Sequence, residues 1–340
     1  MDQRYFRIRP AYADETLDIL TALPQATAVT GVDLFYKIDG RARLAPLACY
    51  KQAKIMGMDL SSAIVVHALD VGEENELHVL DLCCAPGAKL AYISDLAKHP
   101  LSTVTGVDIS QHRIATCKRV CRKLRLGNVR LFKADGTSFR IHRPATRAGT
   151  LTRCFDKDVV LEPSSNLVKP YLCPRLWALD PQYTHPDLLY DRVLVDAECT
   201  HDGSVVHVKK WMNNAKPPLA LTDSTRIRGL PQLQLSLLIN GWNMLKPEGI
   251  LVYATCSLTI EQNEQVIAQF VEWLIHRGIF HELTWENVPI PDNVPALSAK
   301  TEGTVLMKDL PWNRVVRLDP DYSGVSGMFI VKMRKCKPWC

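Results

Sequence analysis

No part of this 340-residue sequence contains an apolar run long enough to cross a lipid bilayer, so we expect no transmembrane helix. The first 15 residues mix three arginines with three acidic residues and lack an apolar core, so we expect no secretory signal. The eleven cysteines include no C-x-x-C pair of the kind that zinc sites use, and we expect no metal site. Free thiols indicate a reducing intracellular compartment, with cytoplasm, nucleus, nucleolus and mitochondrion left undistinguished.

The composition is that of a folded protein with a mild positive charge. Hydrophobic residues make up 47% of the chain, which suffices for one large α/β domain and a small appendage. The net charge of +5 permits a polyanionic partner without requiring one.

From residue 77 onward, strand-like apolar runs alternate with helical stretches. We expect strands at 77–82, 102–107, 128–133, 191–195, 249–254, 281–285 and 328–333, and helices at 88–98, 111–126, 230–245 and 261–277. Ser110 is the expected N-cap of the second helix, and Pro231 is expected near the first turn of the third. This alternation predicts an α/β fold with a doubly wound, mainly parallel sheet. The last two strands lack a long helix between them, so we expect one strand to run antiparallel.

Two regions do not follow this alternation. Residues 1–75 mix helical and strand-like pieces and are predicted to form a small accessory domain. Residues 76–340 form the main domain, with a long insertion at about 136–190 that separates two strands.

The turn after the first strand of the main domain has the features of a ligand-binding loop. Residues 81–89 place Pro86 and Gly87 before a helix, whose free N–H groups suit a carboxylate. Asp108, Asp135 and Asp196 follow at the ends of the next three strands, where ligands of open α/β sheets bind. We therefore predict a nucleoside site, and the missing G-x-G-x-x-G motif disfavours a dinucleotide.

Two cysteines stand at the ends of later strands, at positions 199 and 256. One such cysteine is more often a buried structural residue, but two at the ligand-facing edge indicate chemistry. A thiolate can add to C6 of cytosine and make C5 nucleophilic toward a sulfonium methyl donor, which divides a hard step into two easier ones.

Several segments match one family pattern in order along the chain. They are GMDLSS at 57–62, LDLCCAPGAK at 80–89, VDIS at 107–110, DRVLVDAEC at 191–199, the TCS motif within 230–264, and SGMFIVK at 326–332. Together they resemble the motifs of the Sun-domain family of RNA cytosine-5 methyltransferases, which is related to bacterial Fmu-type rRNA enzymes. The likeness covers about residues 55–135 and 190–335.

This resemblance implies a Rossmann-like fold and an S-adenosylmethionine-dependent enzyme that forms 5-methylcytosine in tRNA or rRNA. Cys256 would be the nucleophile and Cys199 would assist product release, while Asp196 would contact the target base with Lys89 as its charge partner. The residues that would hold S-adenosylmethionine are Cys83, Cys84, Ala85, Pro86, Gly87, Ala88, Lys89, Asp108, Asp135 and Asp196.

The chain departs from the family pattern at three positions. Glu198 replaces the proline before the first cysteine, and Cys84 and Ala88 replace alanine and glycine in the first loop. The Glu198 carboxylate is expected to raise the pKa of Cys199, to take a proton-transfer role, or to mark reduced activity. The last outcome supports an alternative, a weak or inactive family member that acts as an RNA-binding or ribosome-assembly factor.

Two other enzyme classes fit less well. A DNA cytosine methyltransferase would carry its nucleophile after a proline at the fourth strand, where this chain has Glu198. A small-molecule methyltransferase leaves the second cysteine unexplained.

An RNA substrate requires a phosphate-binding surface, because the target base must be unstacked to reach a thiol. Basic candidates, with Trp211 as a stacking residue beside them, are Arg4, Arg7, Arg9, Arg140, Arg143, Arg147, Arg153, Lys209, Lys210, Lys332, Arg334, Lys335 and Lys337. Whether a protein partner or a ribosomal particle adds to this surface is left open.

Overall fold

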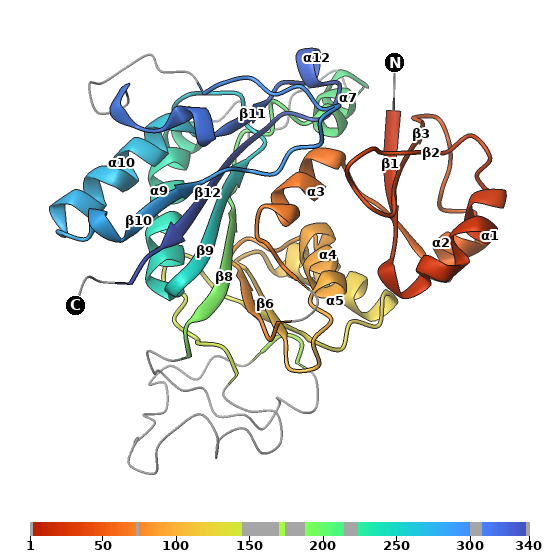
Figure 1. Ribbon diagram of the computed structural model, residues 1–340, viewed down its shortest axis with the longest axis horizontal. Coiled ribbons are helices and arrows are strands. Elements are labelled where there is room, and N and C mark those ends of the chain that lie inside the picture. The colour runs from red at the N-terminus through yellow and green to blue at the C-terminus, as the bar shows by residue number, and fades with distance from the viewer. Residues whose placement is uncertain are drawn as a thin grey trace, which may run out of the picture.

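The computed structural model describes residues 3–72, 75–144, 170–173, 188–213, 224–299 and 308–337. They form a small four-stranded sheet near the N-terminus and a larger eight-stranded sheet, which Figure 1 shows side by side. The expected strands and helices of the main domain are all present within this part of the chain. Most of the insertion at 136–190, with Arg147 and Arg153, lies outside the described residues.

The larger sheet has the order β10-β12-β9-β8-β5-β6-β7, and β11 also pairs with β12. Its strands are β5 (His78–Asp81), β6 (Thr103–Asp108), β7 (Val129–Lys133), β8 (Tyr190–Asp196), β9 (Leu245–Thr255), β10 (Leu283–Glu286), β11 (Val316–Leu318) and β12 (Met328–Lys335). Strands β7, β6, β5, β8 and β9 are parallel to one another, and β12 is antiparallel to β9. This arrangement confirms the mainly parallel, doubly wound sheet and its antiparallel strand.

Helices cover both faces of this sheet (Figure 1). One face packs against α3 (Leu60–His67), α4 (Ala88–Leu96) and α5 (Gln111–Lys123), and the other packs against α9 (Ser224–Met244) and α10 (Glu264–His276). Successive strand residues therefore belong to different cores: Val79 packs on the first face and Leu80 on the second. Nearly every residue of β5 to β9 is buried, as expected for a sheet covered on both sides.

Two details of the helices compare directly with expectation. Ser110 caps α5 and accepts a hydrogen bond from the backbone N–H of Arg113, as predicted. The position expected for Pro231 is wrong, because α9 begins at Ser224 and holds this proline in its interior. The first turn of α9 carries no apolar periodicity, so the sequence pattern does not reveal the start of this helix.

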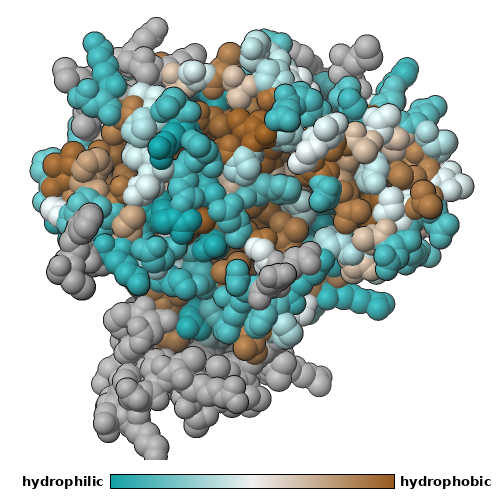
Figure 2. All heavy atoms as spheres, in the orientation of Figure 1, coloured by the Kyte–Doolittle hydropathy of each residue, from teal (hydrophilic) through white to brown (hydrophobic). Residues whose placement is uncertain are grey.

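Three shorter helical segments, α7 (Val205–Asn213), η4 (Phe280–Glu282) and η5 (Trp312–Arg314), and the last helix, α12 (Pro320–Ser323), connect the remaining elements. Within the described residues, no helix has both the length and the hydrophobicity that a membrane span needs. Figure 2 shows hydrophilic and hydrophobic residues interspersed over one face of the molecule.

The small sheet has the order β2-β3-β1-β4, all antiparallel. It consists of β1 (Gln3–Ile8), β2 (Thr27–Ala28), β3 (Phe35–Asp39) and β4 (Ile55–Gly57), with η1 (Pro10–Glu15), α1 (Thr16–Thr21) and α2 (Ala48–Lys51) around its own core. Arg7 and Arg9 fasten it to α4, since each lies 2.7 Å from a carboxylate oxygen of Asp95 and both are buried.

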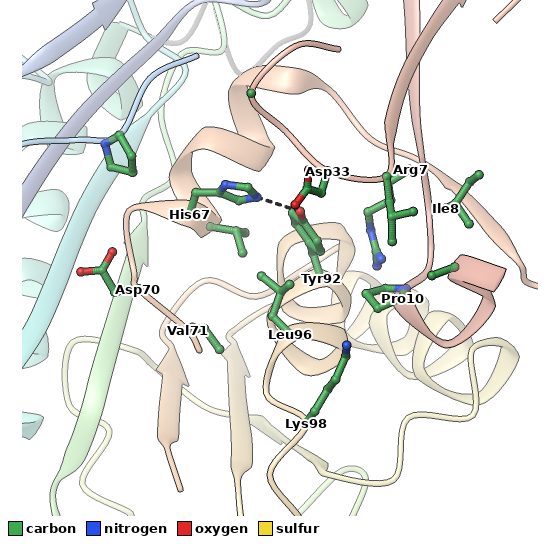
Figure 3. A pocket seen from close by; sticks show the side chains of 15 residues that line it. Arg7, Ile8, Pro10, Asp33, His67, Asp70, Val71, Tyr92, Leu96 and Lys98 are labelled. Atoms are coloured by element: carbon green, nitrogen blue, oxygen red, sulfur yellow. Dashed lines mark hydrogen bonds between the residues drawn. The ribbon is translucent and has the colours of Figure 1, made fainter. Parts of the chain in front are cut away.

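A cavity of about 590 Å³ lies where the small sheet meets α3 and α4 (Figure 3). His67 from α3 and Tyr92 from α4 meet across it, 2.7 Å apart, and Arg7 and Asp33 approach from the small sheet and its loops. None of the residues expected to bind the cofactor or the base lines this cavity.

A buried ion pair joins α10 to β11 behind the sheet edge. Arg317 donates to both carboxylate oxygens of Glu264, at 2.8 and 3.2 Å, and to the backbone oxygen of Leu258 at 2.8 Å. Neither side chain is more than 3% exposed. Removing Arg317 would take a cation and two hydrogen bonds from a buried carboxylate.

We expect Arg317→Met to lower the free energy of unfolding by about 3–5 kcal/mol, because the buried Glu264 carboxylate loses the cation and the two hydrogen bonds of Arg317. Urea denaturation followed by circular dichroism measures the change. Arg41→Met is the matched control, since the Arg41–Asp39 pair lies at the surface and its loss leaves the midpoint unchanged. Equal midpoints for both variants would contradict the role given to the buried pair.

Candidate active site

The two cysteines expected to react lie together because of the register between β8 and β9. These parallel strands pair Val195 with Tyr253 and Asp196 with Ala254. The loops that follow the two strands therefore begin next to each other. The sulfur atoms of Cys199 and Cys256 then lie 3.5 Å apart. Cys199 is buried and Cys256 is partly exposed.

Hydrogen bonds fasten the loop after β8 to the loop after β9. Asp202 accepts from the backbone N–H of Leu258 at 3.0 Å, and Gly203 donates to the backbone oxygen of Cys256 at 3.0 Å. The hydroxyls of Thr200 and Ser257 are also 3.0 Å apart. The two cysteine-bearing loops therefore form one rigid unit.

A network of buried polar side chains holds the two cysteine-bearing loops. Gln262 accepts from the backbone N–H of Thr200 at 3.1 Å, and Gln234 of α9 donates to the backbone oxygen of Glu198 at 2.8 Å. Asn263 pairs with Thr255 at 2.5 Å and donates to the backbone oxygen of Ser257 at 2.9 Å. Buried amides that make such bonds hold a backbone in one conformation.

His201 is part of the site, although it is not among the residues expected from the sequence. Its Nδ1 atom lies 2.9 Å from the sulfur of Cys256 and 3.6 Å from that of Cys199. Its backbone has a φ of +57°, in the left-handed region that non-glycine residues rarely adopt. A ring nitrogen of His201 and the two cysteine sulfur atoms all lie within 4.8 Å of one another. Its place two residues after a strand-end cysteine is the one sequence signal that could have indicated it.

The two thiols titrate as a pair. Cys256 and His201 form hydrogen bonds that lower the pKa of Cys199 to about 6, although burial opposes this. The hydrogen bond with Cys199 and burial raise the pKa of Cys256. The pair thus loses one proton readily and holds the other firmly.

Asp196 and Lys89 meet beside the thiols. The ammonium group of Lys89 lies 2.8 Å from a carboxylate oxygen of Asp196. Burial disfavours the charge on Lys89, but Asp196 outweighs this effect and raises the pKa of Lys89. Lys89 from the first turn of α4 and Asp196 from the end of β8, which are expected to act together, are therefore in contact.

Glu198 points toward α9 and forms an ion pair with Arg226. The expectation that its carboxylate raises the pKa of Cys199 is wrong, because hydrogen bonds from Cys256 and His201 lower that pKa. The backbone bond from Gln234 restrains Glu198 where the family has a proline.

The first loop has an open helix end. Gly87 has a φ of +108° at the N-cap of α4, and no side chain caps the free N–H groups of the first turn. Ala88 is the first residue of the helix, where its methyl group is accommodated. Cys84 is buried, with its sulfur 3.9 Å from that of Cys117, so its side chain packs inside the protein.

The acidic residues at the strand ends differ in exposure. Asp108 is buried and accepts from the backbone N–H of Ser110, while Asp135 is exposed and accepts from that of Thr137. Asp81, which the sequence did not single out, is buried at the end of β5. Burial and the nearby charge of Asp196 raise the pKa of Asp81 to about 8.

Several of the basic residues expected to face RNA are instead engaged within the protein. Lys332 is buried against Asp70 and Glu286, and Lys335 donates to backbone oxygens of α9 and β9. Arg7 and Arg9 pair with Asp95. The remaining candidates with described contacts are Arg4, Arg140, Arg143 and Arg334, which donate to Ala42, Asn240, His78 and Glu286 respectively. Side-chain charge in the sequence does not reveal which of these cations are already paired.

Comparison with known proteins gives one consistent result. The model of the family described as 16S rRNA methyltransferase RsmB/F matches residues 66–167 and 174–334. A probable ribosomal RNA small subunit methyltransferase B of Bacillus subtilis is 29% identical over 288 residues, which span 84% of this chain and 49% of that protein. The chain thus spans about half the length of this relative.

Two solved structures from Pyrococcus horikoshii share the fold. A methyltransferase homolog protein is 22% identical with a TM-score of 0.64, covering 98% of this chain and 87% of the other. The crystal structure of NSun6 with SFG is 15% identical with a TM-score of 0.66, covering 99% of this chain and 91% of the other. The expected Rossmann-like fold is confirmed.

The loop unit leaves no room for a side chain at Gly203. A Cβ atom there would lie 2.9 Å from the backbone oxygen of Cys256 and 3.1 Å from Cα of Gly327. We expect Gly203→Ala to lower the free energy of unfolding by about 1–3 kcal/mol through overpacking. Thermal denaturation measures the change. Gly229→Ala, which meets nothing within 4 Å on α9, is the control and should stabilise the protein slightly. A harmless Gly203→Ala would show that the loops are not clamped.

Proposed function

The chain belongs to the 16S rRNA methyltransferase RsmB/F family, and from this premise we propose that it is an S-adenosylmethionine-dependent RNA (cytosine-C5)-methyltransferase. The single observation that supports this activity most is the pair of cysteines 3.5 Å apart at the ligand-facing edge of the sheet. One thiol must add to the base and a second group must assist its release, and the site supplies both within contact distance.

The first loop and its neighbours fit S-adenosylmethionine by the chemistry of their groups. The uncapped N-terminus of α4 offers N–H groups to the carboxylate of the methionine part. The buried carboxylate of Asp108 is an acceptor for ribose hydroxyls. Asp81 suits the amino group of the methionine part, because a cation beside it would offset the burial that now disfavours its charge.

The other expected contacts follow from place along the chain. Asp135 follows the end of β7 at the edge of the sheet where ligands are expected, and Asp196 pairs with Lys89 in the first turn of α4. Cys83, Ala85, Pro86 and Gly87 would contribute the wall of the loop. Cys84 would contribute only its backbone, because its side chain packs against Cys117.

The chain's own residues then divide the reaction. Bound S-adenosylmethionine supplies an electrophilic methyl group on a sulfonium. Cys256 adds through sulfur to C6 of cytosine, so that the C5–C6 π electrons become available at C5. Asp196 would accept a hydrogen bond from the base, and the Lys89 ammonium held beside it would stabilise the negative charge that addition creates on the base. Cys199, with its lowered pKa, assists loss of the C5 proton and departure of the sulfur.

The departures from the family pattern are compatible with catalysis. Glu198 is neutralised by Arg226, and Ala88 adopts helical backbone dihedrals. Among the described residues, no structural feature favours the alternative of an inactive RNA-binding factor over an enzyme.

RNA is the proposed substrate, with rRNA favoured over tRNA by the family. Aromatic rings extend from the thiols along α7: His201 stacks on His207 with centroids 4.7 Å apart, and His207 lies 6.2 Å from Trp211. Unstacked bases bind to such rings. We also propose that residues 1–75 form an RNA-contacting accessory domain beside the methyltransferase domain of residues 76–340, and that a ribosomal particle or protein partner completes the RNA surface. Free thiols at all nine described cysteines agree with a reducing intracellular compartment.

We expect Cys256→Ser to abolish transfer of labelled methyl groups to rRNA, because a hydroxyl does not add to C6 as a thiolate does. Cys199→Ala should instead accumulate a covalent protein–RNA adduct that survives denaturing gels, and sequencing of the attached RNA identifies the substrate. An adduct that persists in the Cys256→Ser/Cys199→Ala double variant would contradict the assignment of the nucleophile.

We expect Asp108→Asn to weaken S-adenosylmethionine binding by about tenfold to a hundredfold, because hydrogen bonds to a charged group contribute about 1.5–3 kcal/mol. Isothermal titration calorimetry measures the dissociation constant. Asparagine can still accept from Ser110, so the local turn is retained. Asp39→Asn on the small sheet is the control. Unchanged affinity in Asp108→Asn would remove this residue from the cofactor site.

A further inference from the structure

His201 lies where a proton acceptor for the nucleophile would have to be. Its Nδ1 atom is 2.9 Å from the sulfur of Cys256, closer than the sulfur of Cys199 is. Nothing in the motifs of the chain assigns this histidine a role, and the sulfur of Cys256 has no other hydrogen-bonding nitrogen or oxygen partner in the described part of the protein.

The backbone holds this contact at a cost. A φ of +57° is unfavourable for a histidine and persists only where the surrounding structure enforces it. The next two residues anchor the turn, because Asp202 binds the backbone of Leu258 and Gly203 binds that of Cys256. Any other conformation at His201 would break these bonds or move the ring away from the sulfur.

We propose that His201 is a catalytic residue that accepts the thiol proton of Cys256 when this sulfur attacks C6, which deepens the proposed function and rests on it. The S–H bond breaks and its proton moves to Nδ1 of the neutral ring, while the sulfur electron pair forms the bond to C6. The C5–C6 π electrons then serve C5. When the C6–S bond breaks at product release, the imidazolium returns the proton to the sulfur.

The charges around the ring suit this task. Burial and the charge of Arg113 lower the pKa of His201, but the hydrogen bond with Cys199 and the charges of Cys199 and Asp196 outweigh them and raise it. The ring therefore retains a proton once it receives one. Cys256 needs such a contact, because the hydrogen bond with Cys199 and burial both favour its protonated form.

The groups that face His201 include a second imidazole. His207 of α7 stacks on its ring and is itself 2.8 Å from the hydroxyl of Ser204. His207 is exposed and forms no contact with Cys256 among the described hydrogen bonds. Substitution of His207 is therefore a matched control for the loss of an imidazole next to the thiols.

The test is the pH dependence of Cys256 alkylation by iodoacetamide, without RNA or S-adenosylmethionine, in a Cys199→Ser background and with EDTA to remove metal ions. Mass spectrometry of the peptide that contains Cys256 gives the rate at each pH. In His201→Asn, the midpoint should rise by about one pH unit or more, and the rate at pH 7 should fall about tenfold. Asparagine tolerates a positive φ, so the turn is retained.

Two further variants keep this test decisive. His201→Gly, which also tolerates the backbone, should show the same shift, and it replaces the asparagine variant if that one is unstable. His207→Phe keeps a stacked ring and should leave the midpoint unchanged. Equal midpoints with and without the His201 ring would overturn the proposal, as would a shift of the same size in His207→Phe.

Methyl transfer distinguishes failure of this inference from failure of the proposed function. In the chain with both cysteines intact, His201→Asn should lose turnover mainly below pH 8 and regain much of it at higher pH, where Cys256 ionises without help. A chain that shows the alkylation shift but methylates no RNA would retain the cysteine–histidine pair and lose the proposed activity. Turnover reduced equally at all pH values would mean that His201 has only a structural role.

Discussion

The site depends on the parallel register between β8 and β9. Because Asp196 pairs with Ala254, the loops after the two strands begin side by side. Cys199 and Cys256, which are 57 positions apart in sequence, therefore have their sulfur atoms 3.5 Å apart. A shift of one residue in either strand would turn its side chains to the opposite face of the sheet. The buried side chains on both faces of these strands fix the register, so packing of the core determines the geometry of the reactive groups.

The loops above this register are held by polar groups that a hydrophobic core does not need. Gln234, Gln262 and Asn263 are almost fully buried, and the side-chain amide of each forms hydrogen bonds with the cysteine-bearing loops. Burial of amides is costly unless their hydrogen bonds are made. Three buried amides close to the thiols contribute less to stability than apolar side chains would, but they hold Cys199, His201 and Cys256 in a rigid arrangement.

Most of the fold and part of the site were predictable from the sequence. Strands such as 102–107 and the cap at Ser110 follow from local patterns, and strand-end positions placed Asp196 and Cys256 at one edge. His201 escaped prediction because its position depends on a positive φ and on contacts from another strand. The basic residues escaped for a similar reason: a lysine such as Lys332 is counted as surface charge until its buried acidic partners are known.

Glu198 illustrates how the fold replaces one restraint with others. A proline before Cys199 would restrict the backbone through its own ring. Here Gln234 holds the backbone oxygen of Glu198 and Arg226 holds its carboxylate, and both partners come from α9. The loop is therefore restrained from the helix instead of from within. The same helix packs its apolar face on β8, so a change in that packing would also move the backbone before Cys199.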